Sequence, residues 1–152
     1  MLCVSIPVMG RMMSMRIKTY SDMIRYSSFE ERYGYLRMGG MVGSSTFGHS
    51  RYLNQSFYNS RLWRSTRDGL IIRDNGCDLG IPDYQINDKI IIHHMNPITE
   101  EDIETLSAFL LDPEFLICVS GNTHNAIHFG DAGLLPTLPV ERTLHDTSPW
   151  RY

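Results

Sequence analysis

Four of the six histidines in the sequence lie in two close pairs. His93 and His94 are adjacent, and His124 and His128 are separated by three residues. Positions i and i+4 share one face of a helix, so His124 and His128 can offer two imidazoles to one cation. Neighbouring residues of a strand point to opposite sides, so only one of His93 and His94 is expected to join them. The other imidazole, with an ordinary pKa of about 6.5, is suited to take a proton from water beside the cation.

Each pair has a simpler interpretation when it is taken alone. Two histidines at i and i+4 are often surface residues, and an adjacent pair carries even less information. Both pairs together, on a strand and a helix that can meet, favour a metal site. Three histidine ligands leave positions open for water and substrate, whereas a closed structural zinc site takes four protein ligands. The pattern therefore predicts a hydrolytic metal centre rather than a structural one.

The elements that must position these histidines follow from β-branched runs and capping residues. Residues 89–94 predict a strand, which Asn96-Pro97 ends. A capping box at Thr99 predicts a helix over about 100–111, closed by Asp112-Pro113. Residues 115–119 predict a second strand, and a helix that carries His124 and His128 is expected to open after Gly121. This order of strand, long connection, strand and helix can bring the two histidine pairs together.

Two further helices are predicted before this core. Ser28 and Glu31 have the spacing of a capping box, which indicates a short helix that ends at Gly39-Gly40. The amphipathic pattern over 57–74 predicts the longest helix, with Trp63 and Leu70 in the core and a stop at Asn75-Gly76. We therefore divide the chain into a poorly ordered extension (1–15), a helical N-terminal arm and connector (16–48), a main domain (49–132) and an extended tail (133–152).

Arginines on the 57–74 helix are candidate DNA ligands, because guanidinium forks match phosphate oxygens. The candidates are Arg61, Arg64, Arg67 and Arg73. Residues 1–73 contain 11 Lys and Arg against 4 Asp and Glu, whereas residues 74–152 contain 3 against 13. A basic first half could meet DNA while the acidic half surrounds a cation, although solvated faces that differ by chance are the alternative interpretation.

Length and composition fit one domain in a reducing compartment. The 152 residues suffice for one compact core, and no apolar run approaches the roughly 20 residues that span a bilayer, so no membrane association is expected. The sequence has three cysteines, which is a small and odd number for a secreted disulfide framework. This count favours the cytoplasm.

Two sequence blocks carry a resemblance to a known family. They are Ile92–Ile98 (IHHMNPI) and Thr123–Asp131 (THNAIHFGD). Supporting residues precede them at Tyr52–Gln55, Phe57, Tyr58, Trp63 and Ile71–Gly80 (IIRDNGCDLG). Together they resemble the HNH endonucleases of the ββα-metal superfamily, in particular small phage-encoded ones, and the resemblance runs from about Phe29 to Asp131.

The resemblance implies an α+β fold with a ββα-metal (HNH) core, preceding helices and an extended C-terminal tail. It also implies an enzyme that hydrolyses DNA phosphodiester bonds. It makes His94 the general base and makes His93, His124 and His128 the ligands of one divalent metal ion. Mg²⁺ is the first expectation, and imidazole-rich ligation also suits Mn²⁺, Ni²⁺ or Zn²⁺. The implied partners are DNA and, for some relatives, phage packaging proteins, in the cytoplasm of the host cell.

One departure from the family pattern concerns Phe115. The family's central Asn braces the loop that carries the general base, and Phe115 stands at its position, where it cannot make those hydrogen bonds. Asn96 is a conceivable substitute. The alternative function is therefore a weak or inactive HNH-fold module for DNA binding or assembly in a phage DNA-processing machine. A zinc-holding structural domain without nucleic acid is a third interpretation.

A second departure concerns cysteines. Many relatives carry two Cys-x-x-Cys pairs, whereas here Gly80 and Gly121 stand three residues after Cys77 and Cys118. Two thiols cannot complete a tetrahedral zinc site. We therefore expect Cys77 and Cys118 to be small core residues and the structural zinc to be lost.

Overall fold

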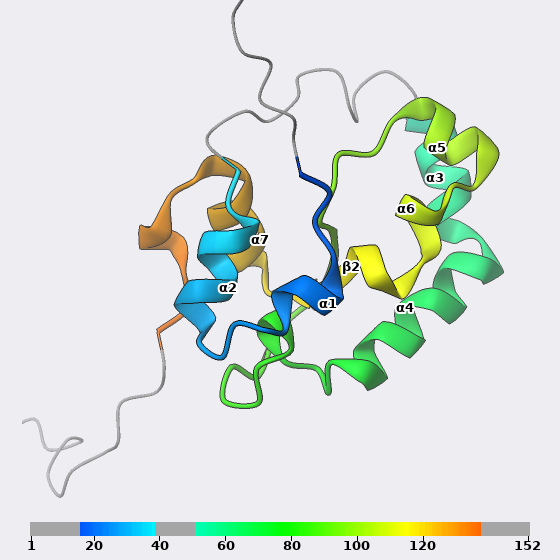
Figure 1. Ribbon diagram of the computed structural model, residues 1–152. Coiled ribbons are helices and arrows are strands. Elements are labelled where there is room, and N and C mark those ends of the chain that lie inside the picture. The colour runs from blue at the N-terminus through cyan, green and yellow to red at the C-terminus, as the bar shows by residue number, and fades with distance from the viewer. Residues whose placement is uncertain (1–15, 39–50, 138–152) are drawn as a thin grey trace, which may run out of the picture.

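The computed structural model describes residues 16–38 and 51–137. Within these ranges the chain forms seven α-helices and a two-stranded antiparallel sheet, which confirms the predicted α+β class (Figure 1). The expected extension at 1–15, nearly all of the connector and the end of the tail beyond residue 137 lie outside the described residues. None of the described helices is long and apolar enough to cross a membrane.

The sheet consists of β1 (Ile91–His94) and β2 (Leu116–Val119). His93 pairs with Ile117 and His94 pairs with Leu116. Because side chains alternate along a strand, these two registered pairs face opposite sides of the sheet. The sheet therefore separates the two adjacent histidines, as the sequence predicts.

The helices lie on both sides of this small sheet. They are α1 (Tyr20–Met23), α2 (Phe29–Leu36), α3 (Arg51–Asn59), α4 (Arg61–Arg73), α5 (Glu100–Thr105), α6 (Ala108–Leu111) and α7 (Gly121–Phe129). Short 3-10 turns occur at Asp78–Gly80, Pro113–Phe115 and Ala132–Leu134. In Figure 1, α2 and α7 stand together on one side, and α3 to α6 gather on the other.

Two hydrophobic clusters fill the two sides of the sheet. The first contains Ile117 and Val119 of β2 with residues of α1, α2 and α7, including Met23, Phe29, Tyr33, Leu36, Ala126 and Ile127. The second contains Leu116 and Cys118 of β2 with residues of α3 to α6, including Phe57, Trp63, Leu70, Ile103 and Leu110. Strand β2 is buried along its whole length because both of its faces are covered. Each histidine pair is therefore attached to a packed core.

Several helix boundaries follow the predicted capping residues. Ser28 and Glu31 form the expected capping box of α2, and Thr99 and Asp102 form that of α5. The turn after α4 places Asn75 and Gly76 at φ values of 52° and 65°, in the left-handed region that these two residue types tolerate best. Local polar chemistry thus sets where these elements begin and end.

Two predicted helices are interrupted, which corrects their boundaries. The predicted 57–74 helix begins instead at Arg61. Ser60 has an extended backbone, and its side chain accepts a hydrogen bond from Trp63 N as the N-cap. Phe57 belongs to the preceding helix, α3. The predicted 100–111 helix is divided at Leu106, which adopts φ 51°. Ser107 then starts a second helix of one turn, α6. This break shapes the loop beside His94.

The cysteines and core aromatics lie where the sequence places them. Cys77 and Cys118 are both buried and free, and among the described residues neither belongs to a group that could hold a metal ion. Trp63 and Leu70 are buried on the inner face of α4. The predicted packing roles of these four residues are confirmed.

Candidate metal centre and groove

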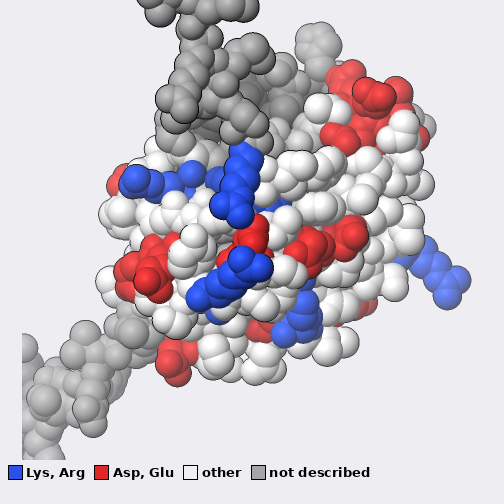
Figure 2. All heavy atoms as spheres, in the orientation of Figure 1, with Lys and Arg blue, Asp and Glu red and all other residues white. Residues whose placement is uncertain are grey.

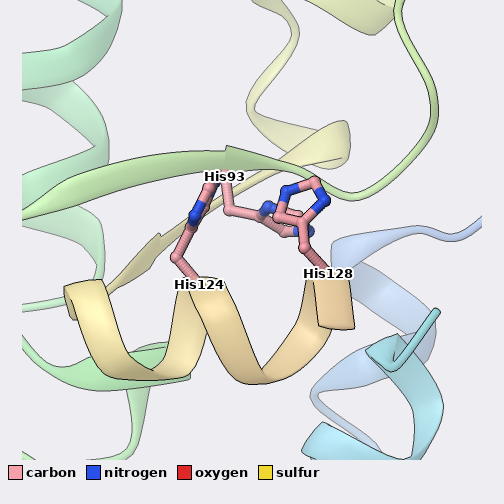
Figure 3. Close-up of side chains that lie close together, drawn as sticks. All are labelled: His93, His124 and His128. Atoms are coloured by element: carbon pink, nitrogen blue, oxygen red, sulfur yellow. The ribbon is translucent and has the colours of Figure 1, made fainter. Parts of the chain in front are cut away.

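Three of the predicted histidines converge on one point. His93 descends from β1 between the rings of His124 and His128, which rise from α7 (Figure 3). The His93 ring lies 5.4 Å from that of His124 and 5.1 Å from that of His128, centroid to centroid. One nitrogen from each ring lies within 4.8 Å of the others, so the group could hold a metal ion. The structure thus brings together residues that are about 30 positions apart in the chain.

The chemistry of this group fits a cation better than a hydrogen-bond network. Nε2 of His93 is the one buried side-chain nitrogen or oxygen, among those the structure describes, that has no hydrogen-bond partner. A buried polar atom left unpaired is costly, whereas a metal ion would use its lone pair. His124 and His128 are half-buried and are reached from the groove described below. The site therefore has one deep ligand and two ligands at its rim.

Burial keeps these imidazoles neutral. It lowers the pKa of His93 well below the ordinary value, and the neighbouring His128 and His124 lower it further. Burial also lowers the pKa of His124 and of His128. A metal ion binds the neutral imidazole, so at neutral pH no proton has to be displaced from the three rings.

Two buried carboxylates hold α7 and the strand that pairs with β1. Asp78 accepts hydrogen bonds from Ser120 N at 3.1 Å and from Thr123 Oγ1 at 2.6 Å, and so fixes the first turn of α7. Asp74 accepts a hydrogen bond from Cys118 N at 2.9 Å, and so fixes β2. Both aspartates come from the segment after α4, within the block Ile71–Gly80 that was singled out in the sequence. Asp78 thus positions the helix of the histidine group directly, and Asp74 positions the strand beside β1.

His94 lies on the other side of the sheet. Its ring stacks on Trp63 of α4, with centroids 5.7 Å apart and planes 15° apart. Its Nε2 lies 3.3 Å from the carbonyl oxygen of Leu110. Burial lowers the pKa of His94 to about 4, against a smaller opposite effect from the Leu110 carbonyl and Asp102. This ring is therefore neutral at pH 7 and keeps one nitrogen available as a base.

All four histidines line one groove of about 1660 Å³, which is larger than the roughly 300–1,000 Å³ typical of small-molecule sites. Of the described charged residues on its wall, five are basic and one, Asp102, is acidic. The basic ones are Arg16, Lys18, Arg37, Arg67 and Lys89. By contrast, acidic and basic side chains are interspersed on the face shown in Figure 2. The described charges on the groove wall are thus mainly positive.

The four predicted DNA-binding arginines occupy different environments. Arg67 lines the groove, whereas Arg61 and Arg64 are exposed on α4 and do not line it. Arg73 points inward: it pairs with Asp74 and donates to the carbonyl oxygens of Pro113 and Leu116. Its guanidinium also lies 3.7 Å from the centre of the Tyr20 ring. These contacts occupy Arg73 inside the fold, so we leave it out of the candidate DNA surface.

The groove also contains basic residues that the sequence analysis missed. Four of its cations, Arg16, Lys18, Arg37 and Lys89, lie outside the predicted arginine helix. Asn96 places Lys18 there: its side-chain amide accepts from Lys18 N and donates to Lys18 O, both at 2.8 Å. The Asn96 side chain is thus committed to the N-terminal segment, and its hydrogen bonds go to the backbone of Lys18. The positive charge of residues 1–73 was the signal for Arg16, Lys18 and Arg37, although it did not show where they lie; Lys89 belongs to the acidic half of the chain.

Comparison with protein-family models, with curated proteins and with solved structures found no match for this chain. The functional argument therefore depends on the geometry of the site and on the resemblance of its residues.

Proposed function

We propose that this protein is a metal-dependent endonuclease of the HNH type, which hydrolyses phosphodiester bonds of DNA. The observation that carries the proposal is the arrangement of the four histidines. Three form a group able to hold one ion, and the fourth, on the same groove, has a neutral ring held in place. A ligand group and a separate base are the two parts that metal-assisted hydrolysis requires.

The roles of the residues follow from this arrangement. His93, His124 and His128 would hold one divalent cation, with Mg²⁺ as the first expectation and Mn²⁺, Ni²⁺ or Zn²⁺ as the other ions that imidazole ligands suit. When bound, the cation would stabilise negative charge on the phosphate and the leaving oxygen. His94 would take the proton from the attacking water. Each imidazole is neutral at pH 7, as these roles demand.

DNA fits the groove by charge. Arg67 and Lys89 on one part of the wall, with Arg16, Lys18 and Arg37 from the N-terminal segment, would contact phosphate oxygens. Such contacts fix the position of a duplex without reading its sequence. Arg61 and Arg64 on the exposed face of α4 would extend this surface.

A plasmid-nicking assay tests the proposal directly. The wild-type protein should convert supercoiled plasmid to nicked or linear forms in the presence of Mg²⁺ or Mn²⁺, and EDTA should stop the reaction. His94→Ala should lose cleavage but retain DNA in a gel-retardation assay. Asn122→Ala, an exposed change at the start of α7, serves as the matched control and should cleave like the wild type.

The alternative function, an inactive DNA-binding or assembly module, makes a different prediction. Wild type and His94→Ala would then be equally inert with every divalent ion, while both retard DNA. A zinc-holding domain without nucleic acid would bind zinc stoichiometrically and show no salt-sensitive DNA binding.

A further inference from the structure

The orientation of His94 depends on one backbone carbonyl. A carbonyl oxygen can only accept a hydrogen bond, so its contact with Nε2 of His94 requires the proton to sit on Nε2. The lone pair of the neutral ring is then on Nδ1. A base with its lone pair on the wrong nitrogen would not accept a proton in the required direction. Whatever holds the Leu110 carbonyl in place therefore selects one tautomer of His94.

The carbonyl belongs to a helix that cannot be stable by itself. Helix α6 has only four residues, and isolated single turns are unfavourable in water. On its N-terminal side, Ser107 donates from its hydroxyl to the carboxylate of Asp102 at 2.6 Å and from its backbone to the Asp102 carbonyl at 2.9 Å. On its C-terminal side, Asp112 accepts at Oδ1 a hydrogen bond from Glu114 N at 2.9 Å, and its backbone N donates to the Ala108 carbonyl at 2.9 Å.

Two aromatic rings pack on that side as well. Phe109, just before Leu110, packs against Phe115 with ring centroids 4.7 Å apart and planes 44° apart. The backbone carbonyl of Phe115 also accepts a hydrogen bond at 3.0 Å from Met95 N, directly after His94. Phe115 is thus linked through its backbone to the strand that carries His94. Through its ring, it is linked to the turn that carries the Leu110 carbonyl.

We propose that the Phe109–Phe115 ring pair is a positioning element of His94, and that its packing, in addition to the hydrogen bonds of Ser107 and Asp112, holds the Leu110 carbonyl against Nε2. This inference rests on the proposed function only where it concerns catalysis. Aromatic pairs of this geometry are stabilising beyond the area that they bury. Phe115 therefore supports the surroundings of His94 by apolar contact, the role that the family resemblance gives to the side-chain amide of an Asn at this position. The presence of Phe115 is thus compatible with activity.

The structural test is the tautomer of His94 in the metal-free protein. Nitrogen NMR of the imidazole at pH 7.5 should show one species in the wild type, protonated on Nε2. Phe115→Ala should give a mixture of the two tautomers, and Phe115→Leu an intermediate result. Phe115→Tyr keeps the ring and should restore the wild-type spectrum. The leucine variant retains most of the apolar volume, so the test survives if the alanine variant fails to fold.

The kinetic test separates positioning from general stability. Phe115→Ala should lower kcat for plasmid nicking by about tenfold to a hundredfold, with the KM for DNA and the affinity for Mn²⁺ unchanged. The matched control is Tyr84→Ala, which removes another aromatic pair, with Phe29, whose rings stack 4.0 Å apart. Tyr84 does not line the groove, so this variant should lose stability but keep the His94 spectrum and kcat.

The results distinguish this inference from the proposed nuclease function. It is overturned if Phe115→Ala and Phe115→Leu keep a single Nε2-protonated species, or if Tyr84→Ala changes the spectrum equally. A wild-type protein that is inert with every metal ion overturns the proposed nuclease function, while the NMR comparison still decides whether the ring pair positions His94.

Discussion

The two faces of the β1–β2 sheet use neighbouring histidines in different ways. On the face covered by α7, His93 has an unpaired buried nitrogen and two further imidazoles beside it. On the face covered by α4, His94 has a carbonyl partner and an aromatic ring against it. The first environment is incomplete without a cation, whereas the second is complete and fixes the direction of one ring. Because its side chains alternate, one strand thus places one imidazole in the candidate metal group and the next in a separate environment.

The comparison also shows what each face demands of its surroundings. The face of the sheet with His93, His124 and His128, here called the metal face, is built around α7. This helix is capped at Ser120, whose backbone N donates to Asp78. Tyr33 of α2 donates from its hydroxyl to the Ala126 carbonyl of α7. The other face is built by a helix broken at Leu106 and a single turn held by side chains. We therefore expect changes on the metal face to affect ion affinity, and changes on the His94 face to affect rate.

The largest expected effect is on the His94 face. His94→Ala should reduce kcat for DNA cleavage by about 10²–10⁴-fold, because a positioned general base contributes about that much. Its affinity for Mn²⁺, measured by isothermal titration calorimetry, should remain within about twofold of the wild type. If ion affinity fell together with kcat, the proposed division of labour between the two faces would be wrong.

The converse change is on the metal face. His128→Ala removes one of three ligands and should weaken Zn²⁺ or Ni²⁺ binding by more than about 100-fold, since even indirect ligand supports are worth 10–100-fold. A stabilising shift in Tm on adding Zn²⁺, expected for the wild type, should disappear. Asn122→Ala on the same helix is the control and should keep both. Unchanged ion binding in His128→Ala would show that the three imidazoles do not act as one site.

The sequence predicted the metal face better than the other. Alternation along a strand and the i, i+4 spacing on a helix are local rules, and they predicted that His124 and His128 would meet one of the two adjacent histidines. The choice of His93 came from the family resemblance. The Leu110 carbonyl and the Phe109–Phe115 contact depend on the break at Leu106. Leu106 takes a left-handed φ of 51°, which leucine does not favour. Its residue type therefore did not predict the break in the helix.

The charged residues show the same limit. Arg67 and Arg73 are both arginines of α4, six positions apart, and composition could not distinguish them. Only the fold shows that one lines the groove and that the other lies against Asp74 and two carbonyl oxygens. The basic N-terminal segment was visible as net charge, but Asn96 determines where Lys18 lies.

This difference between the two arginines can be measured. Arg73→Gln should lower the free energy of unfolding by about 3 kcal/mol, because it leaves the buried carboxylate of Asp74 without its cation. Arg67→Gln should change stability little, since its ion pair with Asp68 is long and exposed, at 3.8 Å. It should instead weaken DNA binding and reduce the salt dependence of that binding by about one phosphate contact. Urea unfolding and salt-dependent gel retardation measure the two effects.

The smallest expected effect is the pH dependence of the metal-free protein. Burial holds the pKa of His94 at about 4, and it also lowers the pKa values of the three metal-face histidines, below the value of about 6.5 in an unfolded chain. Below pH 6.5 the unfolded state therefore binds more protons than the folded state. The free energy of unfolding should be level above about pH 7 and fall as the pH drops, with His94 alone accounting for about 2 kcal/mol at pH 4.5.

His94→Phe sharpens this prediction, because it keeps a ring on Trp63 and removes the titrating group. In EDTA, urea unfolding of this variant should show a shallower loss of stability between pH 6.5 and 4.5 than the wild type, and the remaining slope should come from the metal face. Saturating Zn²⁺ should steepen the acid slope of both proteins, since protons then compete with the ion for three rings. An equal slope in EDTA for both proteins would mean that His94 is not kept neutral by the fold, and the contrast between the two faces would lose its electrostatic basis.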